Sequence, residues 1–483
     1  MHILGREDFP LLLLITSLVS WLWGSQLLLV PLRLESRAAA PRLADYRYNR
    51  TMTAYNAWAW FGYRANPYSE TTLAADETGH LLLAGREKEV ERISKRLGSD
   101  GNFPALEGPV GAGKTSLLNV TSYRMAKHFT ELKQGRLFIP AASPLQARIN
   151  SDDFESSLYE VILQTLLKWQ DDIEGVGLGR PNLALLDKWV NSAEYTGHQA
   201  SAGVAGFSGG YGSSSEPNTS AGFERHGFQK QIRKILDEVF PAGAGGIICI
   251  LDNLEILETT GDARRALEEL RDRVFGIPQI RWVLCGSRGI VSRARSERLS
   301  GIFQMPIVLD KLPDDAAVEA VRRRLDLFSE EGAVAPVTPD GFAFIYSVLN
   351  RNMRDALAAA QEFSHELWDK YDQRRDLPNQ AGREEQLKEW LLDRGRSALD
   401  GAKAIQPRVW QFFEKICRTG GRAGSSEFDS FLFNNQQQFT SAVTSLVGAN
   451  LMVREVDPDD GTRTINAVTS TGWLVFHARK CDG

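Results

Sequence analysis

The chain has few cysteines: four in 483 residues, at Cys249, Cys285, Cys417 and Cys481. They form no CxxC pair and no Cys/His cluster, which argues against a disulfide scaffold and against a zinc site. Usage of this kind is typical of a reducing compartment. An excess of charge of one sign is also lacking, because 56 basic and 61 acidic residues give a net charge of -5. The composition therefore carries no bulk signal for nucleic-acid binding.

The most specific pattern present is Gly108–Thr115, whose sequence GPVGAGKT matches GxxxxGK[ST] in full. An apolar approach precedes it and a helix-like run, Ser116–Met125, follows, which is the strand–loop–helix setting of a phosphate-binding loop. The glycines allow backbone N–H groups to turn inward as an anion nest. The helix that starts near Lys114 adds its positive N-terminal end. The pattern predicts nucleotide binding.

Two side chains of this loop carry the expected chemistry. Lys114 supplies a positive charge for the β- and γ-phosphates, and the Thr115 hydroxyl is a magnesium ligand. The residues expected to surround the phosphates are Gly108, Pro109, Val110, Gly111, Ala112, Gly113, Lys114, Thr115 and Ser116.

Apolar strand-like runs alternate with amphipathic helical runs through residues 79–312. Gly246–Leu251 and Ile280–Cys285 are continuously apolar, which is typical of strands buried on both faces. The alternation predicts an α/β fold, a parallel sheet covered by helices. Within it, the Gly/Ser-rich stretch 197–222 is predicted to be a flexible surface insertion, with a short hairpin as the alternative.

A carboxylate follows the first of these buried strands. Asp252 is positioned to orient magnesium beside Thr115. The next residue is Asn253, which cannot act as a base, so hydrolysis is expected to be slow. Glu255 either polarises the attacking water or is only a charge at a helix N-terminus, and the residues do not separate the two.

Several arginines extend the candidate site. Ser287 and Arg288 follow the second buried strand and are expected to contact the γ-phosphate. Arg354 begins a helix and either contacts the nucleotide or is a surface arginine. Three more arginines are candidates for acting in trans on a neighbouring copy, although a solvated basic surface is favoured: Arg293, Arg295 and Arg298.

The C-terminal part is predicted to be helical. Residues 313–400 form a helical lid, and residues 401–483 form short helices followed by a β-hairpin, the pattern of a winged helix. Its presumed recognition helix, Gln436–Ala449, contains no Lys or Arg. A DNA-binding helix normally has phosphate contacts nearby, so contact with a protein or autoinhibition is favoured over DNA binding.

Near the N-terminus, Leu11–Val30 contains no charged residue and spans about 30 Å as a helix. It predicts a transmembrane anchor over residues 1–35, in preference to a cleaved signal peptide or a buried helix. Arginines follow the span, so the C-terminal bulk is placed in the cytoplasm, below an inner or plasma membrane. Residues 36–78 are predicted to be an aromatic-rich juxtamembrane linker.

Together these features resemble the AAA+ and STAND ATPase superfamily, on the branch near the origin-recognition type ATPases. The resemblance covers about Leu82 to Trp473. Gly85–Glu87 resembles the box that lies against adenine, which makes Arg86 a cofactor-binding candidate. Asp252 matches the Walker B position, Ser287 and Arg288 the first sensor, and Arg354 the second. Asn253 departs from the acidic residue usual in AAA+ motors.

The resemblance implies ATP and Mg²⁺ as cofactors and self-association as a property. The function expected from the sequence is a membrane-anchored, cytoplasmic, slow ATPase that acts as a switch or assembly scaffold for a protein partner. The alternative is an ATP-gated DNA-binding protein that uses the winged helix.

Overall fold

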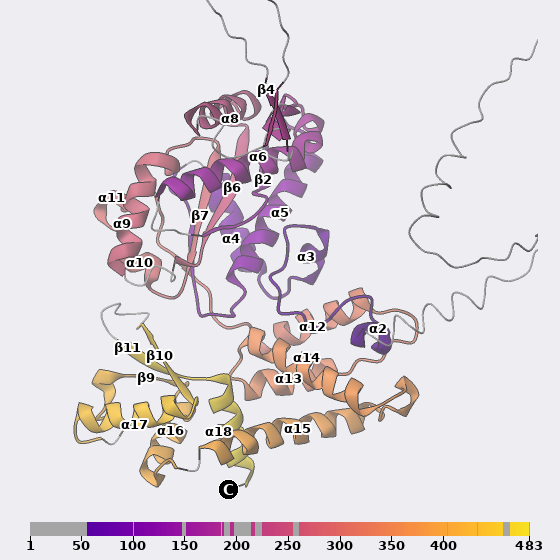
Figure 1. The fold of residues 1–483 in the computed structure, drawn as a ribbon, viewed down its shortest axis with the longest axis vertical. Helices are drawn as coiled ribbons and strands as arrows, with labels where there is room; N and C mark the ends of the chain where they lie inside the picture. Colours follow the sequence, from indigo (N-terminus) through magenta and orange to yellow (C-terminus); the bar gives the residue numbers. More distant parts are fainter. Residues whose placement is uncertain are drawn as a thin grey trace, which may run out of the picture. The chain divides into compact units, whose positions relative to one another are not determined.

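A computed structural model describes residues 56–99, 101–146, 151–184, 186–187, 194–197, 214–217, 225–254, 260–402, 404–431, 433–456 and 464–482. The elements of Ala54–Gly483 belong to one unit and follow the chain from a sheet domain through a helical domain to a C-terminal domain (Figure 1). The predicted anchor Leu11–Val30, the candidate Glu255 and most of the insertion 197–222 lie outside the described residues.

The sheet domain is built on parallel strands. They are β1 (Ala105–Glu107), β2 (Leu137–Pro140), β3 (Leu145–Gln146), β6 (Gly245–Asp252), β7 (Ile280–Gly286) and β8 (Ile307–Val308). Their order is β2-β6-β7-β1-β8, and β3 pairs with the end of β6. The strand that leads into the phosphate loop, β1, thus lies between β7 and β8. The predicted α/β parallel sheet is confirmed.

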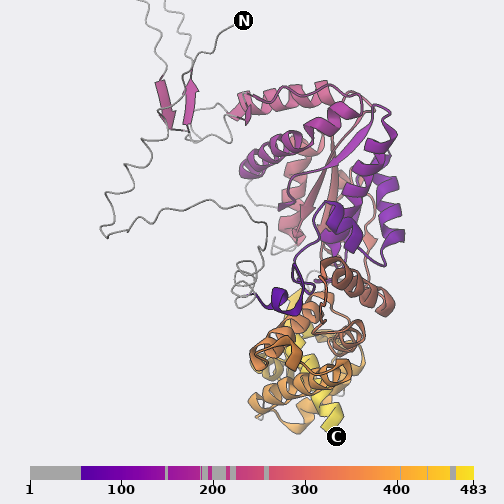
Figure 2. The same ribbon diagram turned by 90° about the vertical axis from the view of Figure 1, so that its right-hand side faces the viewer.

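Helices cover both faces of this sheet, and the strands lie between helical layers in Figure 2. Along β6, Ile247, Cys249 and Leu251 belong to one buried cluster, whereas Ile248 and Ile250 belong to another. The first cluster includes side chains of α6 (Ser151–Gly175), α8 (Arg225–Val239) and α9 (Thr260–Leu270), and the second those of α4 (Glu87–Gly98) and α5 (Lys114–Leu132). Burial on both faces is why these strands are continuously apolar.

Short elements complete the sheet domain. A π-helical turn, η2 (Arg271–Phe275), continues α9, and α10 (Ile290–Ala294) and α11 (Glu297–Ser300) connect β7 to β8. At the borders of the Gly/Ser insertion, β4 (Glu194–Gly197) pairs antiparallel with β5 (Ser214–Pro217).

The helical domain consists of α12 (Asp314–Phe328), α13 (Pro339–Val348), α14 (Met353–Lys370), the turn η3 (Arg374–Asp376) and α15 (Gln380–Gly401). Polar residues begin three of these helices. The side chains of Thr338, Asn352 and Asn379 accept hydrogen bonds from backbone N–H groups in the first turns of α13, α14 and α15.

The aromatic segment before the sheet domain belongs to the core of the helical domain. α2 (Ala57–Phe61) begins it, and Phe61, Tyr63 and Tyr68 are buried among α12, α13 and α14. The backbone N–H groups of Val334 and Arg64 donate to Phe61 O and Phe328 O, both at 2.9 Å. The segment then passes to α3 (Glu77–Leu82), which packs on α5. We call residues 56–86 the N-terminal arm.

The C-terminal domain contains α16 (Pro407–Arg418), β9 (Arg422–Gly424), α17 (Gln436–Gly448), β10 (Met452–Val456), β11 (Thr464–Val468) and α18 (Ser470–Asp482). Its antiparallel sheet has the order β10-β11-β9. A 3-10 turn, η4 (Ser425–Glu427), occupies part of the range where a short helix is expected. α18 packs on α15 closely enough that a Cβ atom on Gly395 would lie 2.4 Å from Leu474 O.

The predicted localisation in a membrane requires correction. Across the described part of the chain, no helix has both the length and the apolar character needed to cross a bilayer. The segment on which that prediction depended, Leu11–Val30, is not among the described residues. We therefore withdraw the single-pass localisation and the cytoplasmic orientation derived from it.

Candidate functional site

The phosphate loop connects β1 to α5 with the geometry that its glycines allow. Gly111 and Gly113 have φ angles of 80° and 82°, in the left-handed region, and Gly113 is the N-cap of α5. A Cβ atom on Gly108 would lie 2.7 Å from Leu309 O, so this glycine permits close contact between the loop and the end of β8. The loop therefore depends on these three glycines for its conformation and its packing.

Lys114 folds back over this loop. Its side chain is 8% exposed, and Nζ donates to Gly108 O at 3.0 Å and to Pro109 O at 3.1 Å. An ammonium group has three donors, so these two contacts do not exhaust it. The charge is thus held at the loop, where an anionic ligand in the nest would meet it.

Thr115 and Asp252 lie together although their strands are not neighbours. The Thr115 hydroxyl donates to Asp252 Oδ2 at 2.6 Å, and Asp252 Oδ1 accepts from the Asn253 N–H at 2.9 Å. They meet because parallel strands present their carboxyl ends at one edge of the sheet.

These two oxygen donors suit magnesium, which proteins usually hold through one or two carboxylates together with substrate phosphates. No group of three or more His, Cys, Asp or Glu suited to a metal occurs in the described part of the chain, so an all-protein cage is not the arrangement found there.

Arg86 joins the N-terminal arm to the loop. It is 5% exposed, and its guanidinium donates to Asp310 O at 2.7 Å and to Ala112 O at 3.4 Å. Burial lowers the pKa of this guanidinium, and the nearby Glu89 carboxylate opposes the shift. The contact with adenine that the resemblance implies for Arg86 stays a prediction.

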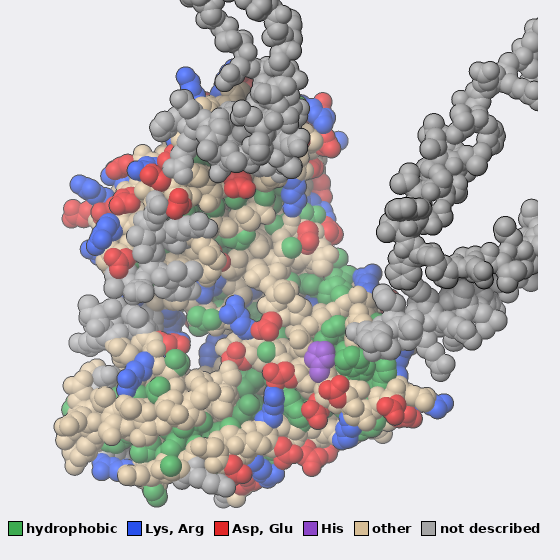
Figure 3. All heavy atoms as spheres, viewed as in Figure 1, with side chains coloured by type: hydrophobic (Ala, Val, Ile, Leu, Met, Phe, Trp, Pro, Cys, Tyr) green, Lys and Arg blue, Asp and Glu red, His purple; other side chains and the backbone are tan. Residues whose placement is uncertain are grey.

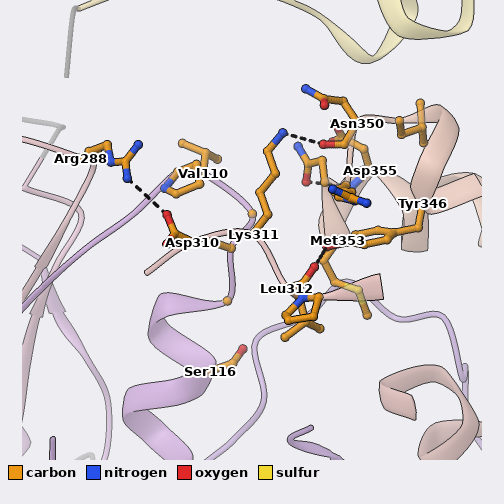
Figure 4. Close-up of a pocket in the computed structure, with 18 of the residues that line it drawn as sticks. Val110, Ser116, Arg288, Asp310, Lys311, Leu312, Tyr346, Asn350, Met353 and Asp355 are labelled. Atoms are coloured by element: carbon orange, nitrogen blue, oxygen red, sulfur yellow. Dashed lines mark hydrogen bonds and ion pairs between the residues drawn. The ribbon is translucent and has the colours of Figure 1, made fainter. Parts of the chain in front are cut away.

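Ser287 and Arg288 lie at the end of β7, on the wall of the same cavity as the loop. The Arg288 guanidinium forms an ion pair with Asp310 at 3.2 Å and is 45% exposed (Figure 4). An incoming phosphate would therefore compete with Asp310 for this arginine.

The first turn of α14 covers the loop. A Cβ atom on Gly111 would lie 2.5 Å from Asn352 Oδ1 and 3.3 Å from the Cβ of Arg354. Arg354 is exposed and, unlike Asn352 and Met353, is not among the described residues that line the cavity. The structure thus brings the backbone of this turn to the loop without directing the Arg354 side chain into the cavity.

The arginines considered for a role in trans differ in their surroundings. Arg293 lines the cavity. Arg295 donates to Phe303 O at 3.1 Å and to Ser300 O at 3.2 Å within its own subunit. Arg298 is exposed on α11. Arg298 is therefore the best placed of the three to contact a second copy.

The cavity itself has a volume of about 1090 Å³. The sheet domain contributes Arg86 and the phosphate loop, and the helical domain contributes Tyr346 and Asn350. The C-terminal domain contributes residues of β9, β10, β11 and α18, namely Arg422, Glu455, Ala467, Val468, Ser470 and Trp473. Figure 4 shows Lys311, which the sequence analysis did not select, extending across this cavity. No sequence motif marks Lys311 or Arg422.

Comparisons with known proteins give structural neighbours only. No family model and no curated protein matches the chain. The ORC1 protein of Aeropyrum pernix in complex with DNA is 14% identical, with 83% of this chain and 93% of that chain covered and a TM-score of 0.40.

Two further neighbours are of the same kind. The Aeropyrum pernix ORC2 protein (ADPNP-ADP complexes) is 12% identical, covers 87% of this chain and 99% of its own, and has a TM-score of 0.43. Cdc6p from Pyrobaculum aerophilum is 11% identical over 87% and 99% of the two chains, with a TM-score of 0.35. The chain is thus similar, at low TM-score, to AAA+ replication-initiator structures.

Proposed function

We propose that the chain binds Mg-ATP in this cavity and acts as a nucleotide-dependent switch or assembly scaffold for a protein partner. The contact between the Thr115 hydroxyl and the Asp252 carboxylate, 2.6 Å long and beside the Lys114 loop, carries the proposal. Because the helical and C-terminal domains form the remaining walls, a bound nucleotide would contact all three domains. Differential contacts of this kind allow a ligand to shift a conformational equilibrium.

The direct test is a calorimetric titration of the full chain with ATP, in the presence and absence of Mg²⁺. Binding that strengthens with Mg²⁺ is expected, because Thr115 and Asp252 supply oxygen donors beside the phosphates. If millimolar ATP does not bind under either condition, the proposal fails.

Hydrolysis is expected to be slow. The residue after Asp252 is Asn253, whose φ of 57° is in the left-handed region and whose amide side chain cannot accept a proton. A slow turnover suits a switch that persists in the ATP state. The role of Glu255 in polarising water stays a prediction.

Self-association is expected to depend on the nucleotide. Apolar side chains are exposed at the sheet edge formed by β8, where Met305 is 61% and Val308 is 45% exposed. Exposed edges and apolar patches favour association. We expect the mass of the full chain, measured by light scattering, to rise at least about twofold when a non-hydrolysable ATP analogue replaces ADP. A monomer with both nucleotides would contradict the scaffold part of the proposal.

The alternative function, ATP-gated DNA binding, concerns the C-terminal domain. Its order of helices and its three-stranded sheet β10-β11-β9 support the interpretation as a winged helix. The exposed surface of α17 carries uncharged polar side chains: Gln436, Gln437, Thr440, Ser441, Thr444 and Ser445. In Figure 3 the face over α17 shows little charge, and charges of both signs are interspersed elsewhere on this face.

We therefore expect the full chain to bind duplex DNA weakly, with a dissociation constant no tighter than about 10⁻⁴ to 10⁻⁶ M, the non-specific range. Fluorescence anisotropy at low and at physiological salt, with ADP and with the ATP analogue, measures it. Tight binding that appears only with the analogue and weakens steeply with salt would favour the DNA function over the protein-partner function.

A further inference from the structure

The described lining of the cavity carries more positive than negative side chains. Seven basic residues line it: Arg86, Arg288, Arg293, Lys311, Arg324, Arg351 and Arg422. Four acidic residues oppose them: Asp310, Asp314, Asp355 and Glu455. The chain as a whole has a net charge of -5, so this local excess runs against the overall balance. A cavity of this sign raises the local concentration of anions.

Each of these carboxylates already has a partner. Asp310 pairs with Arg288 at 3.2 Å, and Asp314 pairs with Arg351 at 2.6 Å. Glu455 lies 3.7 Å from Arg422. Asp355 accepts a hydrogen bond from the Ser470 hydroxyl at 2.5 Å. The acids of the cavity are therefore engaged by groups other than Lys311.

Lys311 lacks such a partner. No carboxylate of the described residues lies within ion-pair distance of it, and its Nζ donates to Asn350 O at 2.7 Å. Solvent reaches the side chain because it extends into the cavity, between Val110 and Asn350 in Figure 4. Enough protein surrounds the ammonium for burial to lower its pKa, and Arg422 and Arg351 lower it further. An anion beside Lys311 would relieve this cost.

We propose that Lys311 binds a phosphate group in this cavity, with Arg351 and Arg422 beside it, at a position additional to the phosphate loop. A phosphate suits the site because its oxygens accept several charge-assisted hydrogen bonds at once. The group is either the terminal phosphate of a bound nucleotide or free inorganic phosphate. The first source rests on the proposed ATP binding, whereas the second does not.

The position of this site links the three domains. Lys311 lies in the connection between β8 and α12, Arg351 lies just before α14, and Arg422 belongs to β9 of the C-terminal domain. A phosphate that attracts all three stabilises the arrangement in which they face one cavity, by the free energy of its binding. The site is thus positioned to couple the phosphate content of the cavity to the C-terminal domain.

The test uses the full chain with Lys311→Met, Lys311→Arg and Arg422→Gln. The matched control is Lys95→Met, since Lys95 is a surface lysine on α4, 74% exposed and away from the cavity. Calorimetry measures the affinity for Mg-ADP, for a non-hydrolysable Mg-ATP analogue, and for inorganic phosphate with and without ADP. Thermal unfolding checks that each variant is folded, and Arg422→Gln supplies a second variant if Lys311→Met is not.

If the terminal phosphate is the ligand, Lys311→Met weakens the ATP analogue on the order of 10- to 100-fold, the factor expected for a hydrogen bond to a charged group, and leaves ADP unchanged. If free phosphate is the ligand, the same variant loses phosphate binding instead. Lys311→Arg retains most of either affinity, Arg422→Gln shifts it in the same direction as Lys311→Met, and Lys95→Met changes nothing.

Equal affinities of the wild type and Lys311→Met for all ligands would overturn the proposal while leaving ATP binding intact. If the wild-type chain binds no nucleotide, the proposed function fails, and the phosphate titration still decides this site. Phosphate binding that disappears in Lys311→Met would then support it. No phosphate binding by the wild type in that case would overturn it.

Discussion

Lys114→Ala is expected to lower the affinity for ATP on the order of 10²- to 10⁴-fold, because it removes charge-assisted hydrogen bonds to two phosphates, each worth about 1.5–3 kcal/mol. The ammonium is 8% exposed and already held at the loop by the carbonyl groups of Gly108 and Pro109, so little reorganisation is needed for it to meet a phosphate. Calorimetric titration with Mg-ATP measures the loss.

The same variant must keep its fold for the result to concern binding. The contacts of Lys114 are with backbone carbonyls that face the cavity, where water can replace the ammonium, so a small change in unfolding free energy is expected. Thermal unfolding of the ligand-free variant should therefore match that of the wild type, and only the stabilisation by added ATP should disappear. Lys95→Ala is the matched control. ATP affinity retained in Lys114→Ala would reject this loop as the nucleotide site.

The parts of the fold that the sequence predicts are those with a local cause. The loop needs glycines at fixed positions, and Gly111 and Gly113 indeed have positive φ angles. β6 and β7 are recognisable because burial on both faces makes them continuously apolar. The meeting of Thr115 with Asp252 also follows, since parallel strands end at one edge.

The rest of the candidate site has no local cause. The cavity is lined by segments from Leu73 to Trp473, and Lys311 acquires its surroundings only when these segments fold together. Nothing about a lysine in the short sequence Asp310-Lys311-Leu312 distinguishes it from a surface lysine. β9 is only three residues long, which is too short for a period-2 pattern to indicate a strand.

The N-terminal arm shows the same limit. Its aromatic residues follow neither a helical nor a strand period, so the sequence describes a linker. Their partners lie far along the chain: the Tyr68 hydroxyl donates to Val337 O, 269 residues away. Tertiary burial, rather than local preference, gives this segment its structure.

Phe61→Ala is accordingly expected to destabilise the chain by about 3–5 kcal/mol, the usual cost of deleting a fully buried phenyl ring and leaving a cavity. The Phe61 side chain is 0% exposed and belongs to the buried cluster that also contains Phe342 and Leu357 of α13 and α14. Urea unfolding monitored by the tryptophans measures the change. Because the arm continues to Leu73, whose N–H donates to Ser116 Oγ at 3.1 Å, the loss should extend to the phosphate loop and weaken ATP binding as well.

The control is Phe61→Leu, which keeps most of the apolar volume and should cost less than about 1.5 kcal/mol. A linker that merely crosses the surface would give a different result, because removing a ring from it changes the unfolding free energy by only about 0.5 kcal/mol or less. An effect of that size in Phe61→Ala would show that the arm is not part of the helical domain. A large effect that also lowers the affinity for ATP would instead show that the arm joins the stability of the helical domain to the occupancy of the loop.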